Sequence, residues 1–178
     1  YREDMAYRKG RRGQDWNWNG MIKQVDIKEV NGDQTIQFPG LKINTTKVPH
    51  STHTQAYRFD SNEKSIVISG DLSYSENLVK LAKNADILVI DGQAITERQR
   101  RRPSRNKSSG MQRRRQQGST RPHATLQEVA TMAAKAGVKK LVLTHLSSGK
   151  IDESATIAAY RKIFKGEIVI GRDLLEVY

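Results

Sequence analysis

Apolar and polar residues alternate along much of the first half of the chain, which is the pattern of half-buried β-strands. Turn-forming residues separate the alternating stretches, and the strongest turn is Asn31-Gly32-Asp33, a typical hairpin connection. The run at 67–71 is more continuously apolar and closes on Gly70-Asp71. The pattern therefore predicts strands over 21–30, 35–38, 41–48 and 56–60, and a further strand that ends at Asp71.

From residue 75 onward, apolar residues recur at helical spacing, and short apolar runs typical of buried strands lie between the helical stretches. Gly137 follows one helical stretch and is a common residue just past a helix end. Hairpins followed by alternating helices and strands favour an α+β protein, or a sheet sandwich flanked by helices. Helices are predicted over 75–82, 125–136 and 152–164, and strands over 85–91, 140–144, 167–170 and 174–177.

Length and composition limit the fold further. A chain of 178 residues suits one domain with a sizeable core, and no stretch is long and apolar enough to span a membrane. The sequence begins with Tyr1 and not Met, so we expect that an upstream segment has been removed or omitted. Because cysteine is absent, any metal must be bound by His, Asp or Glu.

The positive charge is concentrated in one segment. The net charge is +12, and the segment 98–121 holds ten Lys and Arg residues without an acid, which leaves +2 for the rest of the chain. A stretch so rich in Arg, Gln and Ser cannot bury apolar surface, so one interpretation is a disordered, solvated loop. The other is that the segment attracts an anionic substrate. Both stay open at this point.

The residues suited to metal chemistry stand near predicted strand ends. Asp71 closes a buried strand, where a rigid backbone can hold a metal ligand, although it could also cap the helix near residue 75 or close a turn. Of the four histidines, His50, His123 and His145 lie at strand ends or strand-to-helix junctions. Imidazole and carboxylate groups together suit zinc.

Five short motifs follow one another along the chain: Val48-Pro49-His50, Ser69-Gly70-Asp71, Ala85-Asp86-Ile87-Leu88-Val89, His123-Ala124-Thr125 and Val142-Leu143-Thr144-His145-Leu146-Ser147. This order resembles that of the metallo-β-lactamase-fold hydrolases, in the branch of ribonuclease Z and the zinc-dependent arylsulfatase-like enzymes. The resemblance runs from Leu41 to the C-terminus, is interrupted by the basic segment, and extends more weakly to the entry segment around Tyr1 to Arg8. It implies the αβ/βα sandwich of that family, which is an α+β fold.

The resemblance also implies roles for particular residues. His50 matches a zinc ligand of the family's third motif, Asp71 the carboxylate that bridges two zinc ions, and His145 the last ligand of the second ion. His123 matches the histidine that acts as an acid near the leaving group, and Asp91 is placed to orient it. The family pattern assigns no role to His53.

The sequence departs from the family pattern at three points. No His-x-His-x-Asp-His cluster is present, so the resemblance implies only the C-terminal half of the fold, completed by an N-terminal half or another subunit. Ile90-Asp91 stands where ribonuclease Z relatives have His-Glu, which weakens the assignment to tRNA processing. The spacing between the His50 and Asp71 motifs is too short for the tRNA-gripping arm of those relatives.

These expectations divide the chain into four parts: a polar basic entry segment at 1–20, the β-rich part and first βαβ unit of the hydrolase domain at 21–97, the basic insertion at 98–121, and the C-terminal αβ part at 122–178. The function implied is a metal-dependent hydrolase that cleaves phosphate, phosphodiester or sulfate esters through a metal-bound hydroxide. Its substrate would be an anionic small molecule or a nucleic acid.

We further expect a homo-oligomer with no membrane association, and the cytoplasm is the favoured location. The alternative function is a non-catalytic basic half-domain that binds nucleic acid or a partner chain.

Overall fold

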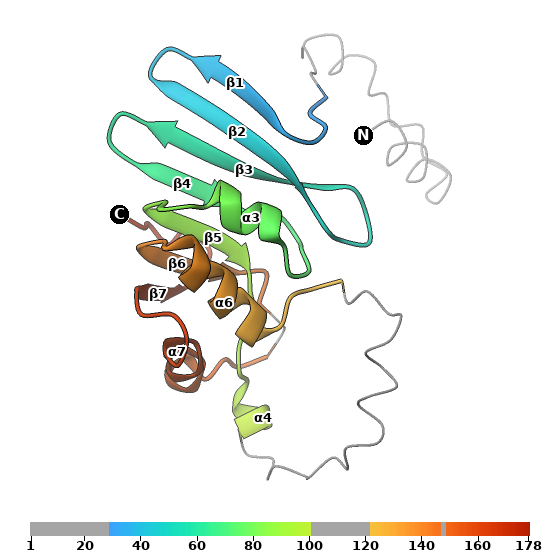
Figure 1. Cartoon of the computed structure of the whole chain (residues 1–178). Coiled ribbons are helices and arrows are strands. Elements are labelled where there is room, and N and C mark those ends of the chain that lie inside the picture. Colours follow the sequence, from blue (N-terminus) through green and yellow to red (C-terminus); the bar gives the residue numbers. More distant parts are fainter. Residues whose placement is uncertain (1–28, 101–121, 147–148) are drawn as a thin grey trace, which may run out of the picture. The chain divides into compact units, whose positions relative to one another are not determined.

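One mixed sheet organises the part of the chain that the computed structural model describes, which is residues 29–100, 122–146 and 149–178. Seven strands lie in the sheet in the order in which they follow one another in the sequence (Figure 1). The strands are β1 Gln34–Phe38, β2 Leu41–Val48, β3 Thr54–Ser61, β4 Ser65–Ile68, β5 Ile87–Asp91, β6 Lys140–Thr144 and β7 Glu167–Ile170. The helices are α3 Glu76–Leu81, α4 Glu97–Arg100, α6 Leu126–Ala136 and α7 Glu153–Arg161.

The direction of the strands brings the carboxyl ends of several strands to one edge of the sheet. Strands β1 to β4 are antiparallel neighbours, whereas β4 to β7 are parallel. Because β3 is antiparallel to both of its neighbours, β2 runs in the same direction as β4 and the parallel strands. The carboxyl ends of β2, β4, β5 and β6 therefore lie at the same edge of the sheet.

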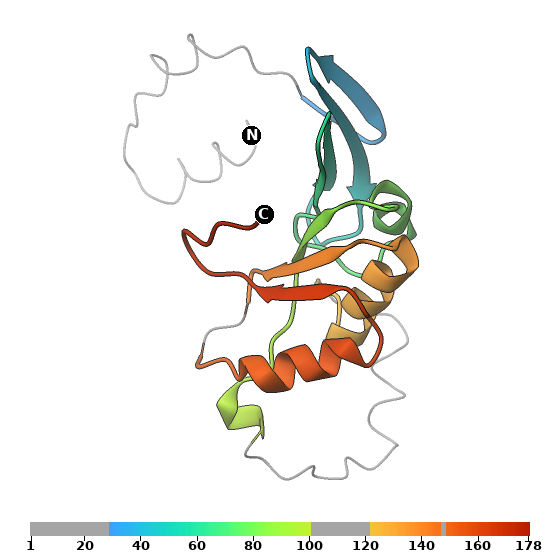
Figure 2. The same cartoon turned by 90° about the vertical axis from the view of Figure 1, so that its left-hand side faces the viewer.

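Helices α3, α6 and α7 connect successive parallel strands and lie on one face of the sheet (Figure 2). Since such crossovers are right-handed, a sheet with strands in sequence order receives all of its helices on the same side. Beneath them, one row of cross-strand neighbours is almost completely buried and forms the centre of the core: Val67, Leu88, Leu141 and Ile168.

Local sequence explains where these helices begin and end. The Thr125 side chain accepts a hydrogen bond from the Glu128 amide, the Glu128 side chain accepts one from the Thr125 amide, and Gly137 closes α6 in the left-handed conformation. Helix α3 is capped by Ser75, whose side chain accepts a hydrogen bond from the Leu78 amide. This excludes Asp71 as the cap of α3.

The opposite face of the sheet carries apolar side chains that no helix of the described residues covers. The row Ile68, Val89, Val142 and Val169 runs across the parallel strands, and Ile68 is 44% exposed. Tyr57 pairs with Ile68 across β3 and β4, so the apolar row continues into the antiparallel part of the sheet. Contiguous exposed apolar surface of this kind often marks a site of interaction with other protein.

Most of the predicted elements agree with the structure, and three differ. Residues 174–177 do not form a strand, and Leu174 is fully exposed with a φ of 61°. Strand β4 ends at Ile68 and not at Asp71, because Gly70 turns the chain with a φ of 62°. The start of the predicted disordered insertion is helical, and Arg100 of α4 forms an ion pair with Asp152.

Other predictions fall on parts of the chain outside the described residues. These parts are the entry segment 1–20, most of the strand predicted over 21–30 and most of the basic insertion. The four-part division of the chain therefore stays a prediction. None of the helices in the described ranges is long and apolar enough to cross a membrane.

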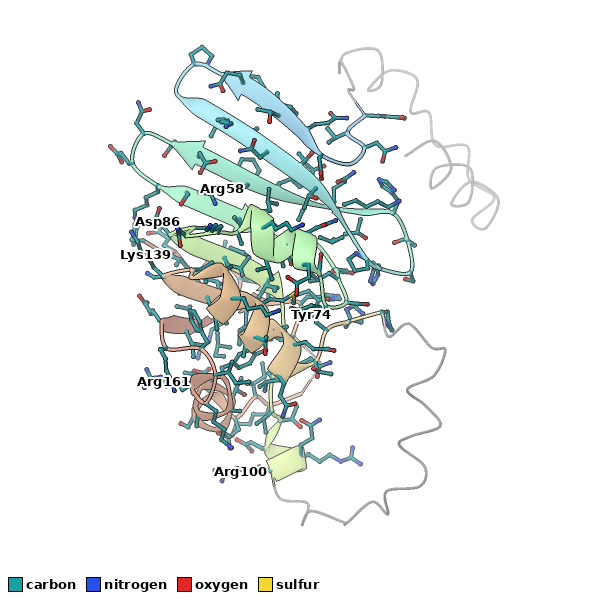
Figure 3. The ribbon with its side chains drawn as sticks, viewed as in Figure 1. Arg58, Tyr74, Asp86, Arg100, Lys139 and Arg161 are labelled. Atoms are coloured by element: carbon teal, nitrogen blue, oxygen red, sulfur yellow. The ribbon has the colours of Figure 1, made fainter. Side chains whose placement is uncertain are left out.

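Asp86 joins the starts of three strands. Its carboxylate accepts hydrogen bonds from the Ser65 amide and hydroxyl, both at 2.8 Å, and from Lys139 Nζ at 2.7 Å. Asp86 and Lys139 are labelled in Figure 3. The hydrogen bond from Lys139, followed by those from Ser65, holds the pKa of Asp86 far below its ordinary value of 3.8.

We therefore expect Asp86→Asn to lower the free energy of unfolding by about 1–2 kcal/mol at pH 7. A carboxylate whose pKa is lowered by folding stabilises the protein above its ordinary pKa, and this stabilisation is lost as the pH falls below that value. The difference between wild type and variant should thus shrink below about pH 4. Denaturant unfolding at several pH values measures it. The exposed Asp173→Asn is the control, and an equal, pH-independent loss in both variants would contradict the role of Asp86.

Candidate metal centre

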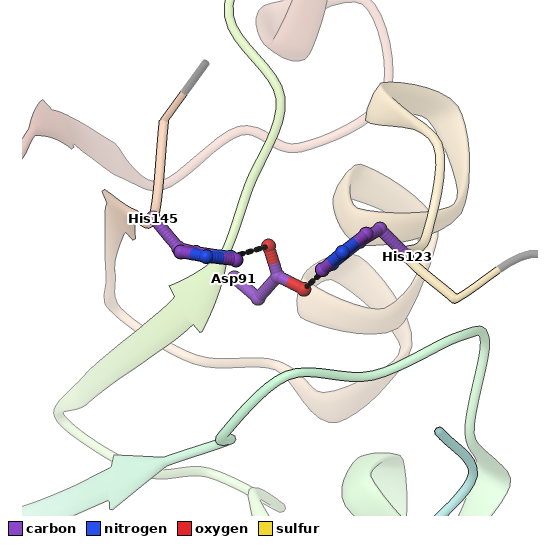
Figure 4. A group of neighbouring side chains, drawn as sticks. All are labelled: Asp91, His123 and His145. Atoms are coloured by element: carbon purple, nitrogen blue, oxygen red, sulfur yellow. Dashed lines mark hydrogen bonds and ion pairs between the residues drawn. The ribbon is translucent and has the colours of Figure 1, made fainter. Parts of the chain in front are cut away.

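Five side chains with metal-binding or proton-transfer chemistry meet at the carboxyl edge of the sheet. His50 follows β2, Asp71 follows the end of β4, Asp91 is the last residue of β5, and His145 follows β6 directly. His123 lies just before α6. Figure 4 shows Asp91 between the rings of His123 and His145.

Asp91 is the buried centre of this group, with only 5% of its side chain exposed. One carboxylate oxygen accepts a hydrogen bond from His123 Nδ1 at 2.6 Å and from the Leu72 amide at 3.3 Å. The other oxygen lies 3.2 Å from His145 Nδ1. The Asp91 amide in turn donates to the Ser69 hydroxyl at 3.1 Å. These contacts fix the carboxylate from both sides.

Asp91 also determines the protonation of His123. The hydrogen bond to Asp91 raises the pKa of the His123 ring, partial burial opposes that shift, and the negative charges of Asp91 and Asp71 add to it. Because the Asp91 carboxylate can only accept, His123 Nδ1 carries the proton in that bond. The second ring nitrogen, Nε2, is then the atom that can give a proton to a ligand or take one from it.

His50 is oriented by a backbone carbonyl. Its Nδ1 lies 2.7 Å from the carbonyl oxygen of Pro122, and because a carbonyl accepts, Nδ1 is the donor. The lone pair is therefore on Nε2, which lies 3.9 Å from Asp71 Oδ2. An imidazole held by its other nitrogen in this way is the usual arrangement of a histidine that binds a metal.

Asp71 lies between two histidines and depends on a glycine for its position. Its oxygens are 3.9 Å from His50 Nε2 and 3.5 Å from His145 Nδ1. Gly70 precedes it in the left-handed conformation, and a Cβ there would lie 2.8 Å from Thr54 Cγ2. The turn that carries Asp71 away from β4 therefore requires glycine for both conformation and space.

His145 also has an unusual backbone, with a φ of 54°, which is uncommon for a residue other than glycine. Such a conformation costs free energy for a residue with a side chain, and Asn84 and Leu174 adopt it as well. In this conformation the ring reaches both carboxylates, at 3.5 Å from Asp71 and 3.2 Å from Asp91.

The donor set fits a divalent metal such as zinc. In one subset, ligand atoms of Asp91, His123 and His145 all lie within 4.8 Å of one another. In a second subset, which shares His145 with the first, the Asp71 carboxylate lies within 4 Å of the imidazoles of His50 and His145. Neutral imidazole and carboxylate are the ligands that zinc prefers when thiolates are absent.

All five residues singled out from the sequence lie in this cluster, and their individual roles stay predictions. His53, to which the family pattern assigns no role, contacts the Gln55 side chain and takes no part. Sequence reasoning missed the supports, which are the Ser69 hydroxyl, the Leu72 amide and the Pro122 carbonyl. Only Ser69 offers a sequence signal, as a polar residue at the end of a buried strand.

The fold and the cluster define a protein with a mixed sheet, helices on one face, and a candidate metal centre at the carboxyl ends of its strands. The beta-lactamase superfamily domain model matches residues 6–146, so the chain belongs to that family. This confirms the family resemblance drawn from the motifs.

Proteins with similar sequences include several named ribonuclease Z. The chain is 31% identical to a ribonuclease Z of Methanosarcina acetivorans over 114 residues, which are 64% of this chain and 32% of that protein. It is 27% identical to a ribonuclease Z of Mycobacterium tuberculosis over 162 residues, which are 86% of this chain and 54% of that protein. The chain thus spans between about a third and a half of these relatives.

Among solved structures, the metallo-beta-lactamase fold protein YhfI from Bacillus subtilis matches 89% of this chain and 59% of its own length. The TM-score is 0.62 at 20% sequence identity, and this likeness shows the fold alone.

Gly70→Ala tests whether the turn before Asp71 positions the site. We expect it to lower the free energy of unfolding by about 1–3 kcal/mol and to reduce zinc affinity. Gly32→Ala is a matched control, because Gly32 has a similar φ of 77° but nothing within 4 Å of an added methyl group. Unfolding and zinc titration compare the two variants. Thr54→Ser, which removes the crowded methyl group, should partly restore Gly70→Ala; equal zinc affinity in both glycine variants would contradict this prediction.

Proposed function

We propose that this chain forms part of a metal-dependent hydrolase that cleaves phosphodiester bonds, within the wider class of phosphate and sulfate esters. The observation that carries the proposal is the convergence of three imidazoles and two carboxylates at the carboxyl edge of one sheet. The ribonuclease Z relatives favour a phosphodiester, and hence a nucleic acid, over the other esters.

His50, Asp71 and His145 would hold the metal in this proposal, with Asp71 between two zinc ions. Bound zinc lowers the pKa of water toward neutrality and polarises the ester, which provides the nucleophile and stabilises developing charge. Within this chain, the Pro122 carbonyl keeps the His50 lone pair on Nε2, and Gly70 places Asp71 between the two rings. The chain's contribution is therefore a prearranged set of ligands.

His123 would donate a proton to the leaving group, and Asp91 would orient the His123 ring. Asp91 favours the protonated ring, and with Nδ1 bonded to Asp91 the second nitrogen can donate its proton to the departing oxygen. After the proton leaves, Asp91 still holds the ring in the same tautomer. Asp91 thus orients the ring and sets its proton affinity.

The complete ligand set would include groups that the described residues do not supply. Two zinc ions need more than His50, Asp71 and His145, and the chain spans only part of its ribonuclease Z relatives. We propose that a second sheet, from an N-terminal half of the fold or from another subunit, brings these ligands and covers the apolar face around Ile68. The convergence of ligand side chains favours this catalytic function over a non-catalytic basic module.

The bridging role of Asp71 is tested in the complete protein. Asp71→Ala should lower zinc content and phosphodiester hydrolysis together. The loss should exceed the roughly 10- to 100-fold that is typical when a residue hydrogen-bonded to a metal ligand is replaced. His53→Ala is the matched control and should keep both, because His53 lies outside the cluster. Zinc is measured by elemental analysis, and hydrolysis with bis(p-nitrophenyl) phosphate. Full zinc content in Asp71→Ala would remove Asp71 from the ligand set.

The basic segment is tested through its charge. We expect replacement of its Lys and Arg residues by Gln to raise the Michaelis constant for an anionic ester and to flatten the dependence of that constant on salt. Arg98 and Arg100 are kept because they belong to α4, and Arg100 pairs with Asp152. The changed residues are Arg101, Arg102, Arg105, Lys107, Arg113, Arg114, Arg115 and Arg121.

The control for this variant is the double change Arg161→Gln and Lys162→Gln at the end of α7, where both side chains are exposed. It should leave the salt dependence nearly intact. If the variant of the basic segment also keeps the salt dependence of the wild type, the segment is a solvated insertion without a role in substrate recruitment.

A further inference from the structure

Two loops that leave the candidate metal centre are joined to each other by backbone hydrogen bonds. Residues 93–100 begin two positions after Asp91, and residues 149–152 begin four positions after His145. We call these two stretches the paired loops. Five residues of extended chain reach at most about 18 Å, so the part of each loop that lies five positions past the centre is within that distance of it.

The bonds between the paired loops fix them as one unit. The Asp152 amide donates to the Ile95 carbonyl at 2.8 Å, and the Glu97 amide donates to the Lys150 carbonyl at 3.0 Å. Helix α7 adds support, because the Thr156 hydroxyl accepts a hydrogen bond from the Ile95 amide at 2.9 Å. A surface that is held in this way binds a ligand with little further loss of conformational entropy.

The cations of the paired loops are more exposed than the acids. Lys150 pairs with Glu97 at 2.8 Å, and their side chains are 81% and 34% exposed. Arg100 pairs with Asp152 at 3.0 Å, and their side chains are 66% and 10% exposed. Arg98 is exposed as well and has no acidic partner within the part of the chain that the structure describes. The paired loops therefore present mainly positive charge to solvent.

We propose that the paired loops bind the phosphates of a nucleic acid strand that extends away from the phosphodiester to be cleaved. Arg98, Arg100 and Lys150 are the side chains that contact this strand. The inference rests on the proposed function, because it places the bond to be cleaved at the candidate metal centre. It goes beyond that function by assigning a surface that distinguishes a polynucleotide from a small ester.

The distance from the centre determines which ligands reach the paired loops. Phosphates of one strand follow one another at about 3.4 Å along a duplex axis, so about 18 Å corresponds to about five nucleotides. A small diester such as bis(p-nitrophenyl) phosphate occupies the centre alone. The paired loops contain no aromatic residue that could stack on a base, so they recognise the phosphate backbone and not the base sequence.

Fluorescence anisotropy with a labelled single strand of about 20 nucleotides tests the proposal in the complete protein. The double change Arg98→Gln and Lys150→Gln keeps the basic segment and the pair of Arg100 with Asp152. It should raise the dissociation constant for the strand by about tenfold. It should also reduce the slope of log affinity against log salt by about 1.4, because each phosphate contact on a single strand contributes about 0.7. The Michaelis constant for bis(p-nitrophenyl) phosphate should stay unchanged.

Two further variants make the test specific. Arg98→Lys with Lys150→Arg keeps both charges and should bind the strand as the wild type does. Arg161→Gln with Lys162→Gln is the matched control, because it removes two exposed charges at the end of α7, where the chain leads into the amino end of β7. It should keep both the affinity and the salt dependence.

Three results would each overturn the proposal: no binding of the strand by the wild type, equal binding by the wild type and the paired-loop variant, or an equal loss in the control. A Michaelis constant for bis(p-nitrophenyl) phosphate that rises as much as the dissociation constant of the strand would also overturn it, because the side chains would then act at the centre itself. The proposed function fails separately, if the wild type does not hydrolyse the small diester.

Discussion

The buried carboxylate of Asp91 is the interaction on which the arrangement of the site depends. It is the last residue of a central strand, and it contacts His123, His145 and the Leu72 amide at once. A buried carboxylate is costly unless hydrogen bonds and opposite charges compensate it, so its partners cannot move away without a penalty. Asp91 therefore links the loops after β4 and β6 to the start of α6.

Backbone hydrogen bonds strengthen the same connection. The Ala124 amide donates to the Leu72 carbonyl at 2.7 Å, and the Ser73 amide donates to the Pro49 carbonyl at 2.8 Å. These bonds tie the approach to α6 to the loop after β4, and that loop to the end of β2. The proposed metal ligands and the proposed acid thus belong to one set of loops connected by hydrogen bonds.

The sequence predicts elements well where local chemistry determines them. Helix α6 is predicted by its spacing and Gly137, and Thr125 and Glu128 form its capping box. The strand predicted over 174–177 is wrong: Leu174 adopts a φ of 61°, which a strand does not contain, and its side chain is fully exposed, so it packs against no face of the sheet. The contact between His123 and Asp91 joins residues that are 32 positions apart in the sequence. It is expected from the family resemblance and not from any local pattern. The Pro122 carbonyl could not be predicted, because backbone contacts leave no trace in the residue types.

The ends of the basic insertion are both secured on the folded domain. On one side, Arg100 of α4 pairs with Asp152 at the start of α7, and on the other the Pro122 carbonyl accepts a hydrogen bond from His50. Closing a longer loop between fixed points costs little extra free energy, since the cost grows only with the logarithm of its length. The length of the segment between Arg100 and Pro122 can therefore change at little cost in folding free energy, and the residues of the candidate metal centre keep their supports when it does.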